Sequence, residues 1–148
     1  MNKHIKGVWL FGSSGSGKTR ISKLIKKYKK NSFVIDGDVV RKHVSFDLNY
    51  TLQDRIIQTK RLLGISKICI YQNYFPIISS VYLGKDIATF AKRINIRIIE
   101  VLRDKKFLNK KIKVRKNIVG IDIKQPKLSS YTIYNNKNLN KNFKLALK

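Results

Sequence analysis

The hydrophobic residues of this chain alternate between short continuous runs and longer stretches in which they recur on one helical face. The run Val8–Phe11 is bounded by glycines, which predicts a buried parallel strand. A glycine-rich turn follows, then a helix that we expect to extend to about Lys30 and a second short strand at Phe33–Ile35. The apolar face of that helix comprises Ile21, Leu24, Ile25 and Tyr28.

The same alternation continues to the end of the chain. Thr51 and Asp54 have the spacing of a capping box in which Asp replaces the usual Glu or Gln, so a long helix should follow. The later expected elements are strands around Pro76–Val81, Ile96–Leu102 and Tyr131–Tyr134, a helix near Asp86–Lys92 and a C-terminal helix after Asn138. Strands that alternate with helices predict an α/β fold, a parallel sheet with helices on both faces.

The length and composition place limits on this fold. A chain of 148 residues is expected to form one domain over residues 1–148, and 43% hydrophobic residues suit a globular protein. No apolar run approaches the roughly 18 residues of a membrane span, and the first residues do not resemble a signal peptide, so we expect a cytoplasmic protein without membrane contact. Cys69 lies between two isoleucines, which favours a buried apolar thiol over a reactive one.

The net charge is +25, from 33 Lys and Arg against 8 Asp and Glu. Such a charge attracts polyanions, and a nucleic-acid surface is one interpretation that it leaves open. The lysines are dispersed along the whole chain, however, and Lys, Ile and Asn are abundant throughout. We therefore interpret the charge mainly as a compositional bias with solvated basic faces.

The most informative motif joins the first strand to the first helix and has the form GxxxxGK[ST]. Its glycines allow successive amide N–H groups to point inward and to bind phosphate oxygens at a helix N-terminus. Lys18 can then reach the β- and γ-phosphates of a nucleotide, and Thr19 can ligate Mg²⁺. The predicted ATP-binding loop comprises Gly12, Ser13, Ser14, Gly15, Ser16, Gly17, Lys18 and Thr19.

A second group of polar residues follows the second strand, at the edge where open α/β sheets bind ligands. Asp36 and Asp38 flank Gly37 there. Either carboxylate can orient an attacking hydroxyl, accept its proton or hold Mg²⁺ through water, and the sequence does not divide these roles. A simple Asx turn is the structural alternative.

A basic segment occupies the region between the fourth and fifth expected strands. Arg103–Lys116 is rich in Lys and Arg and precedes Gly120. In a fold with a phosphate-binding loop, such a segment suggests a lid that closes over phosphates, and a solvated basic loop is the alternative.

With these motifs in order, the chain resembles the adenylylsulfate kinase family. The resemblance covers most of the chain, is strong to about Arg61 and weaker beyond it. It implies a P-loop NTPase-type three-layer sandwich. The blocks that carry it are Gly7–Leu10 with the phosphate loop, Asp36–Arg41, Asp47–Thr51, Asp54-Arg55 and Gly120–Asp122.

This resemblance implies a function and an acceptor site. Family members transfer the γ-phosphoryl group of ATP, with Mg²⁺, to the 3′-hydroxyl of adenosine 5′-phosphosulfate. Arg41 and Arg55 match positions that bind the anionic part of this nucleotide substrate, and Tyr50 matches an aromatic residue that stacks on adenine. Gln58 stands where the family has Asn, and Ile118 stands where it has a second aromatic residue.

The departures leave three alternatives open. Ile118 and a region before Gly120 that is shorter than the family pattern put the acceptor in question, so a related enzyme acting on another nucleotide ester, such as cytidine diphosphoramidate, is the enzymatic alternative. A P-loop protein that binds nucleotide or nucleic acid without catalysis is the second. A nucleoside monophosphate or shikimate-type kinase is the third, but it does not account for the Asp-Gly-Asp and Asp-Arg blocks. Whether the chain forms a homodimer is also open.

Overall fold

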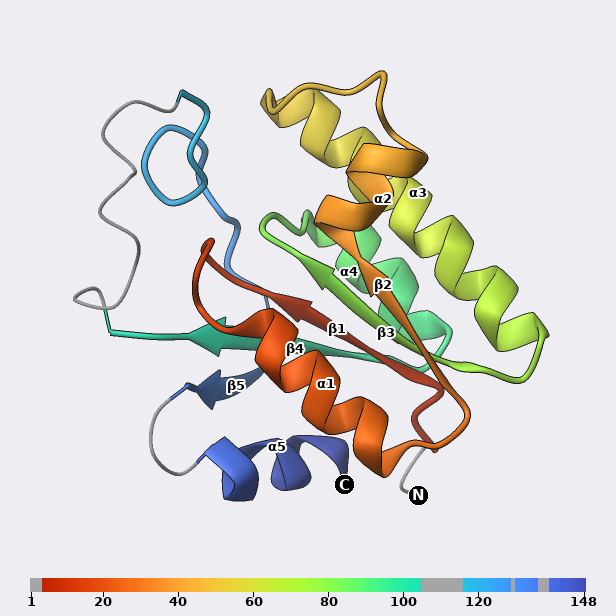
Figure 1. Cartoon of the computed structure of the whole chain (residues 1–148). Coiled ribbons are helices and arrows are strands. Elements are labelled where there is room, and N and C mark those ends of the chain that lie inside the picture. Colours follow the sequence, from red (N-terminus) through yellow and green to blue (C-terminus); the bar gives the residue numbers. More distant parts are fainter. Residues whose placement is uncertain (1–3, 105–115, 129, 136–138) are drawn as a thin grey trace.

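The computed structural model describes residues 4–104, 116–128, 130–135 and 139–148. Five parallel strands form one sheet in the order β2-β3-β1-β4-β5 (Figure 1). In chain order the elements are β1 (Gly7–Phe11), α1 (Lys18–Tyr28), β2 (Ser32–Asp36), α2 (Gly37–His43), α3 (Leu52–Tyr71), β3 (Phe75–Ser80), α4 (Lys85–Arg93), β4 (Ile96–Leu102), β5 (Tyr131–Tyr134) and α5 (Leu139–Leu147). The expected parallel α/β architecture is confirmed.

Helices cover both faces of the sheet, which explains why every residue of β1 is buried. Val8 and Leu10 alternate with Trp9 and Phe11, so successive side chains enter opposite layers. The first pair packs in a cluster with residues of α1 and α5, and the second pair packs with residues of α3 and α4. The resulting three layers confirm the expected sandwich.

The carboxyl ends of the strands face one edge of the sheet. Because neighbouring strands are all parallel, the loops after β1, β2 and β3 emerge together there. The register pairs Asp36 with Ser79 and Phe11 with Ser80, which fixes the relative position of the first three strand ends. The two sequence motifs around Lys18 and Asp36 therefore meet at this edge.

Two local expectations differ from the structure. Helix α2, which directly follows β2, was not predicted, because a seven-residue helix in which only Val40 is buried has almost no apolar periodicity. The Cys69 thiol is half-buried and packs against the core on the α3 side, so the prediction of a buried residue was wrong. Burial nevertheless raises the pKa of Cys69, which disfavours the reactive thiolate.

Candidate active site

The loop between β1 and α1 has the backbone geometry of an anion-binding turn. Gly12, Gly15 and Gly17 all have positive φ angles. Helix α1 begins at Lys18 without a side-chain cap, so the amide groups of its first turn are available to a ligand. A Cβ atom at Gly12 would collide with the carbonyl oxygen of Val101, which explains the requirement for glycine at this position.

The Lys18 side chain folds back over this loop. Its Nζ donates hydrogen bonds to the carbonyl oxygens of Gly12 at 2.7 Å and Ser13 at 2.9 Å. Burial lowers the pKa of Lys18 from 10.5 to about 8, and the nearby carboxylates of Asp38 and Asp36 oppose this shift in part. The ammonium group is therefore close to its titration point in mildly alkaline solution.

This lowered pKa predicts how nucleotide binding depends on pH. Below about pH 8 the Lys18 amine of the free protein is charged, whereas above that pH binding of a polyphosphate must first restore the proton. We expect the affinity for ATP to be flat from pH 6.5 to 7.5 and to fall by up to about tenfold per unit above the pKa. Calorimetric titration with ATP at a series of pH values measures this affinity. Lys18→Arg, which keeps its charge, should remove the decline. A decline that persists in that variant would show that Lys18 is not the group that titrates.

Asp36 has a structural role at the start of α2. One carboxylate oxygen accepts hydrogen bonds from the N–H groups of Asp38 at 2.9 Å and Val39 at 3.4 Å, so Asp36 is the N-cap. The other oxygen accepts a hydrogen bond from the Ser79 hydroxyl at 3.3 Å. The Asx-type interpretation of this residue is therefore borne out in the structure, and its carboxylate is fixed beside the phosphate loop.

Asp38 lies one residue into α2 and has a different environment. Its side chain is exposed and lines the cleft beside Lys18. Within the part of the chain that the structure describes, no group donates a hydrogen bond to its carboxylate, although its charge acts on both Lys18 and Arg55. Of the two carboxylates, Asp38 is thus the one whose oxygens accept no hydrogen bond from the described residues and are the more available to a ligand.

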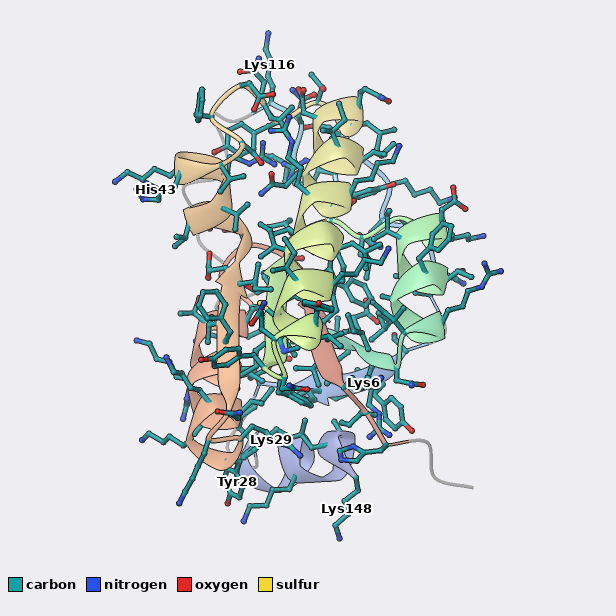
Figure 2. The ribbon with its side chains drawn as sticks, turned by 90° about the vertical axis from the view of Figure 1, so that its right-hand side faces the viewer. Lys6, Tyr28, Lys29, His43, Lys116 and Lys148 are labelled. Carbon is teal, nitrogen blue, oxygen red and sulfur yellow. The ribbon has the colours of Figure 1, made fainter. Side chains whose placement is uncertain are left out.

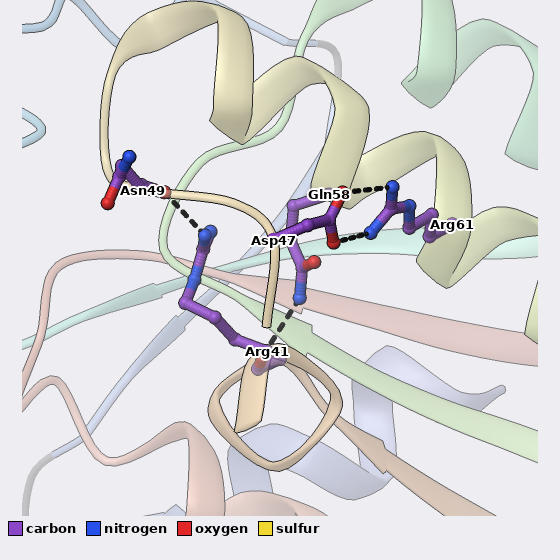
Figure 3. A network of polar contacts seen from close by, with 6 residues as sticks. Arg41, Asp47, Asn49, Gln58 and Arg61 are labelled. Carbon is purple, nitrogen blue, oxygen red and sulfur yellow. Dashed lines mark hydrogen bonds and ion pairs between the residues drawn. The ribbon is translucent and has the colours of Figure 1, made fainter. Parts of the chain in front are cut away.

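Arg41 and Arg55 lie against the ring of Tyr50. Their guanidinium carbons are 4.7 Å and 5.6 Å from the ring centroid, and the ring remains half-exposed. Arg41 Nη1 donates a hydrogen bond to the carbonyl oxygen of Asn49, which holds the loop that presents Tyr50 (Figure 3). The structure thus brings together Arg41, Tyr50 and Arg55, three of the residues that the family resemblance assigned to the acceptor.

Arg55 also joins the two rims of the cleft. Its Nε donates to the carbonyl oxygen of Tyr50 at 3.1 Å, and its Nη2 donates to that of Asn117 at 2.9 Å. Burial lowers the pKa of Arg55, and the positive charge of Arg41 lowers it further. Two neighbouring cations that are partly removed from water form a favourable environment for an anion.

Gln58 is buried beneath this cleft on α3. Its Nε2 donates to the carbonyl oxygen of Gly37 at 2.9 Å, which ties α3 to the start of α2 (Figure 3). Its Oε1 is buried and has no hydrogen-bond partner among the described residues. Nearby, Arg61 and Asp47 form a two-pronged ion pair that holds the loop before α3 against that helix (Figure 3).

The opposite rim is formed by residues 116–121. Ile118 is half-buried there and lines the same cleft as Tyr50. Its N–H donates to the Asp122 carboxylate at 2.8 Å, which closes a tight turn through Gly120. Of the predicted basic lid, residues 105–115 lie outside the described residues, and Lys116 lines the cleft.

These groups surround one open cleft of about 1440 Å³ at the carboxyl edge of the sheet. The predicted site residues that line it, from the phosphate loop to the far rim, are Ser13, Ser14, Gly15, Gly17, Lys18, Thr19, Asp36, Asp38, Arg41, Tyr50, Arg55, Gln58 and Ile118. Gly12 and Ser16, the other two residues of the loop, do not line the cleft. The backbone of Gly12 lies close to the carbonyl oxygen of Val101, and the Ser16 side chain is buried. The motifs found separately in the sequence therefore form a single site.

Two residues from outside the glycine motif contact the phosphate loop, and this contact was not predicted from the sequence. Arg103 Nη1 donates to the carbonyl oxygen of Gly15 at 3.1 Å, and Asn135 Nδ2 donates to that of Ser16 at 2.9 Å. Arg103 had been assigned only to the lid. Asn135 follows the last strand and belongs to no motif, so only the order of strands in the sheet reveals its position.

Charged residues are distributed unevenly around this site. Basic side chains occur at both ends of the molecule, with Lys116, which lines the cleft, and His43 toward one end and Lys29 and Lys148 at the opposite end (Figure 2). The acidic residues, in contrast, lie near strand carboxyl ends or in the loops and first helical turns that follow them: Asp36, Asp38, Asp47, Asp54, Asp86, Glu100, Asp104 and Asp122. Negative charge is thus concentrated on the side of the molecule that holds the cleft.

In the described ranges, no three His, Cys, Asp or Glu side chains cluster as a preformed metal site. None of the helices there combines the length and apolar character needed to cross a bilayer.

The parallel sheet, the glycine loop at the end of β1 and the adjoining carboxylates define a P-loop NTPase-type domain. Comparison with known proteins specifies the family. The model of the family described as adenylylsulphate kinase matches residues 5–105, so the chain belongs to the adenylylsulfate kinase family.

Individual relatives agree with this assignment. The chain is 30% identical over 98 residues to an adenylyl-sulfate kinase of Halothermothrix orenii, a match that covers 64% of this chain and 53% of that protein. A probable adenylyl-sulfate kinase of Pyrococcus abyssi is 29% identical over 98 residues, covering 64% and 56%. The chain thus spans about half the length of these curated relatives.

Solved structures extend the likeness in fold to nearly the whole chain. The Mycobacterium tuberculosis APS kinase CysC, in complex with AMPPNP and APS, superposes with a TM-score of 0.79 at 16% identity, covering 97% of this chain and 96% of that one. A gluconokinase from Sinorhizobium meliloti gives 0.63 at 14% identity, covering 98% and 91%. At these identities the likeness concerns the fold.

Proposed function

We propose that this protein is an ATP-dependent kinase that transfers the γ-phosphoryl group of ATP to the 3′-hydroxyl of adenosine 5′-phosphosulfate. The observation that carries the proposal is the single cleft in which the phosphate loop and Asp38 face the Arg41, Tyr50 and Arg55 cluster. Membership of the adenylylsulfate kinase family supports it. The relative solved with AMPPNP and APS supports the choice of both substrates.

The residues present fit a bound Mg²⁺. Thr19 is exposed at the start of α1, and the carboxylates of Asp36 and Asp38 line the same cleft, which gives the oxygen donors that this ion prefers. Mg²⁺ is typically held by one or two protein oxygens together with substrate phosphates, so the site needs no preformed three-carboxylate cluster. When bound, the ion would neutralise charge on the β- and γ-phosphates.

The donor side of the reaction depends on the phosphate loop. Amide groups at the start of α1 and the Lys18 ammonium are arranged to bind polyphosphate oxygens, and positive charge at this position stabilises a phosphoryl group in transfer. The Lys18 ammonium has three N–H donors, and its bonds to the carbonyls of Gly12 and Ser13 leave one for a phosphate oxygen. Any further bond to phosphate would replace one of these carbonyls.

The acceptor side depends on the opposite wall of the cleft. Tyr50 offers a half-exposed ring to a nucleobase, and Arg41 and Arg55 offer guanidinium groups to its anionic substituent. Asp38 has lone pairs available between the two sides and is the group that we assign to orient the attacking hydroxyl and accept its proton. Ile118, on the opposite rim of the cleft, would offer an aliphatic side chain to the same nucleobase.

A coupled ADP-release assay tests this proposal. With Mg²⁺ and ATP, we expect adenosine 5′-phosphosulfate to raise ADP release well above the rate without acceptor. Cytidine diphosphoramidate, an ester with a different base and a different anionic group, serves as the comparison and should give much less. The opposite order would assign the protein another acceptor, and no stimulation by either compound would contradict the proposed kinase activity.

A further inference from the structure

Two carbonyl oxygens of the phosphate loop, those of Gly15 and Ser16, accept hydrogen bonds from outside the loop. A peptide unit that points its N–H toward an anion points its C=O in the opposite direction. The carbonyl oxygens of Gly15 and Ser16 do not bond within the loop but accept side-chain donors from other parts of the fold. The Gly15 carbonyl is exposed, whereas the bond to Ser16 is partly buried, and a carbonyl removed from water requires a partner. The donor to Ser16 therefore helps to determine the shape of the loop.

The donor to Ser16 is Asn135, at the carboxyl end of β5. Its backbone N–H donates to the carbonyl oxygen of Leu102 at 2.8 Å, which fixes the residue to the end of β4. Its Nδ2 then donates to the carbonyl oxygen of Ser16 at 2.9 Å, across 119 positions of the sequence. The sheet itself thus anchors the hydrogen bond.

Gly17 makes this contact sterically feasible. Its φ is +97°, and a Cβ atom there would collide with the side-chain amide of Asn135. The glycine is therefore required both for the backbone turn and for the approach of Asn135. The absence of a side chain at Gly17 therefore leaves the space in which the Asn135 amide reaches the Ser16 carbonyl.

We propose that Asn135 is a positioning residue for phosphate binding. The carbonyl that it holds belongs to the same peptide unit as the N–H of Gly17, so fixing one end of the unit aims the other toward the cleft. Asn135 does not need to touch the nucleotide to act in this way. The inference rests on the proposed function in one respect, namely that the ligand of the loop is a polyphosphate.

Binding of inorganic tripolyphosphate to the full chain tests this role, because the probe has phosphates but no base. Titrations at about 0.15 M salt limit general attraction to the basic surface. We expect Asn135→Ala and the similarly sized Asn135→Leu to weaken binding about tenfold, the effect of one hydrogen bond, with a melting temperature that stays well above the temperature of the titration. Asn31→Ala is the matched control, since Asn31 also donates a side-chain amide to a carbonyl, that of Asn73, far from the cleft.

The outcomes separate this inference from the proposed function. If Lys18→Ala leaves tripolyphosphate binding of the wild-type strength, the loop is not the site and the proposed function fails. If Lys18→Ala abolishes binding but both Asn135 variants bind like wild type, only the positioning role is overturned. A fall in melting temperature that accounts for the lost binding would likewise overturn it, because the residue would then serve stability alone.

Discussion

Replacing Lys18 by alanine is expected to reduce phosphoryl transfer by about a thousandfold. The variant loses the only described ammonium group that bonds to the phosphate loop, and with it the charge that would stabilise the transferred group. The fold should persist, because Lys18 bonds only to carbonyls of its own loop, and removal of a desolvated cation relieves an unfavourable burial. Steady-state kinetics measures the loss of turnover, and thermal unfolding shows whether the fold is retained.

Lys23→Ala provides the matched control for this prediction. Lys23 is exposed on the same helix and does not line the cleft, so its loss changes the net charge equally. We expect its turnover to stay within about twofold of wild type, as for a surface substitution away from the site. Equal losses in the two variants would show that overall charge, and not the position of Lys18, is responsible.

The second large effect distinguishes the two carboxylates. Asp38→Asn should reduce turnover by roughly 10²- to 10⁴-fold, the contribution expected of a general base. Asp36→Asn should reduce it far less, because the amide oxygen can still cap α2 and the amide NH2 group can donate to the Ser79 hydroxyl in place of the bond that the carboxylate accepts. Asp36→Ala, which removes the cap, should instead lower the free energy of unfolding by about 1 kcal/mol.

Turnover of the three variants and their unfolding in urea provide the test. A larger loss of turnover in Asp36→Asn than in Asp38→Asn would reverse the assignment, and would place the catalytic group on the residue that also caps α2. Unchanged turnover in Asp38→Asn would remove the proton-accepting role from Asp38.

The sequence predicted the sheet and the phosphate loop well because both have local signals. A continuous apolar run marks a strand that is covered on both faces, and the glycine motif must lie between such a strand and a helix. Within the described residues, these patterns therefore located all five strands and four of the five helices to within a few residues. Helix α2 was missed because its stability comes from the Asp36 cap and one buried valine and not from an apolar stripe.

The site was only partly predictable for a related reason. Motif residues such as Arg41 and Arg55 could be identified singly, but their common contact with Tyr50 depends on the loop that Asp47 and Arg61 hold in place. Asn135 has no motif, and its contact with the phosphate loop follows from the placement of β5 beside β4. Long-range strand order is not encoded in any local pattern, so contacts of this kind require the structure.

Transfer of a labelled γ-phosphoryl group is the most direct test of the central claim. The protein is incubated with Mg²⁺, γ-labelled ATP and adenosine 5′-phosphosulfate, and the nucleotide products are separated. We predict that the label appears on the 3′-oxygen of the acceptor, and that Lys18→Ala abolishes it. Label found only in inorganic phosphate, or retained wholly in ATP, would contradict the account.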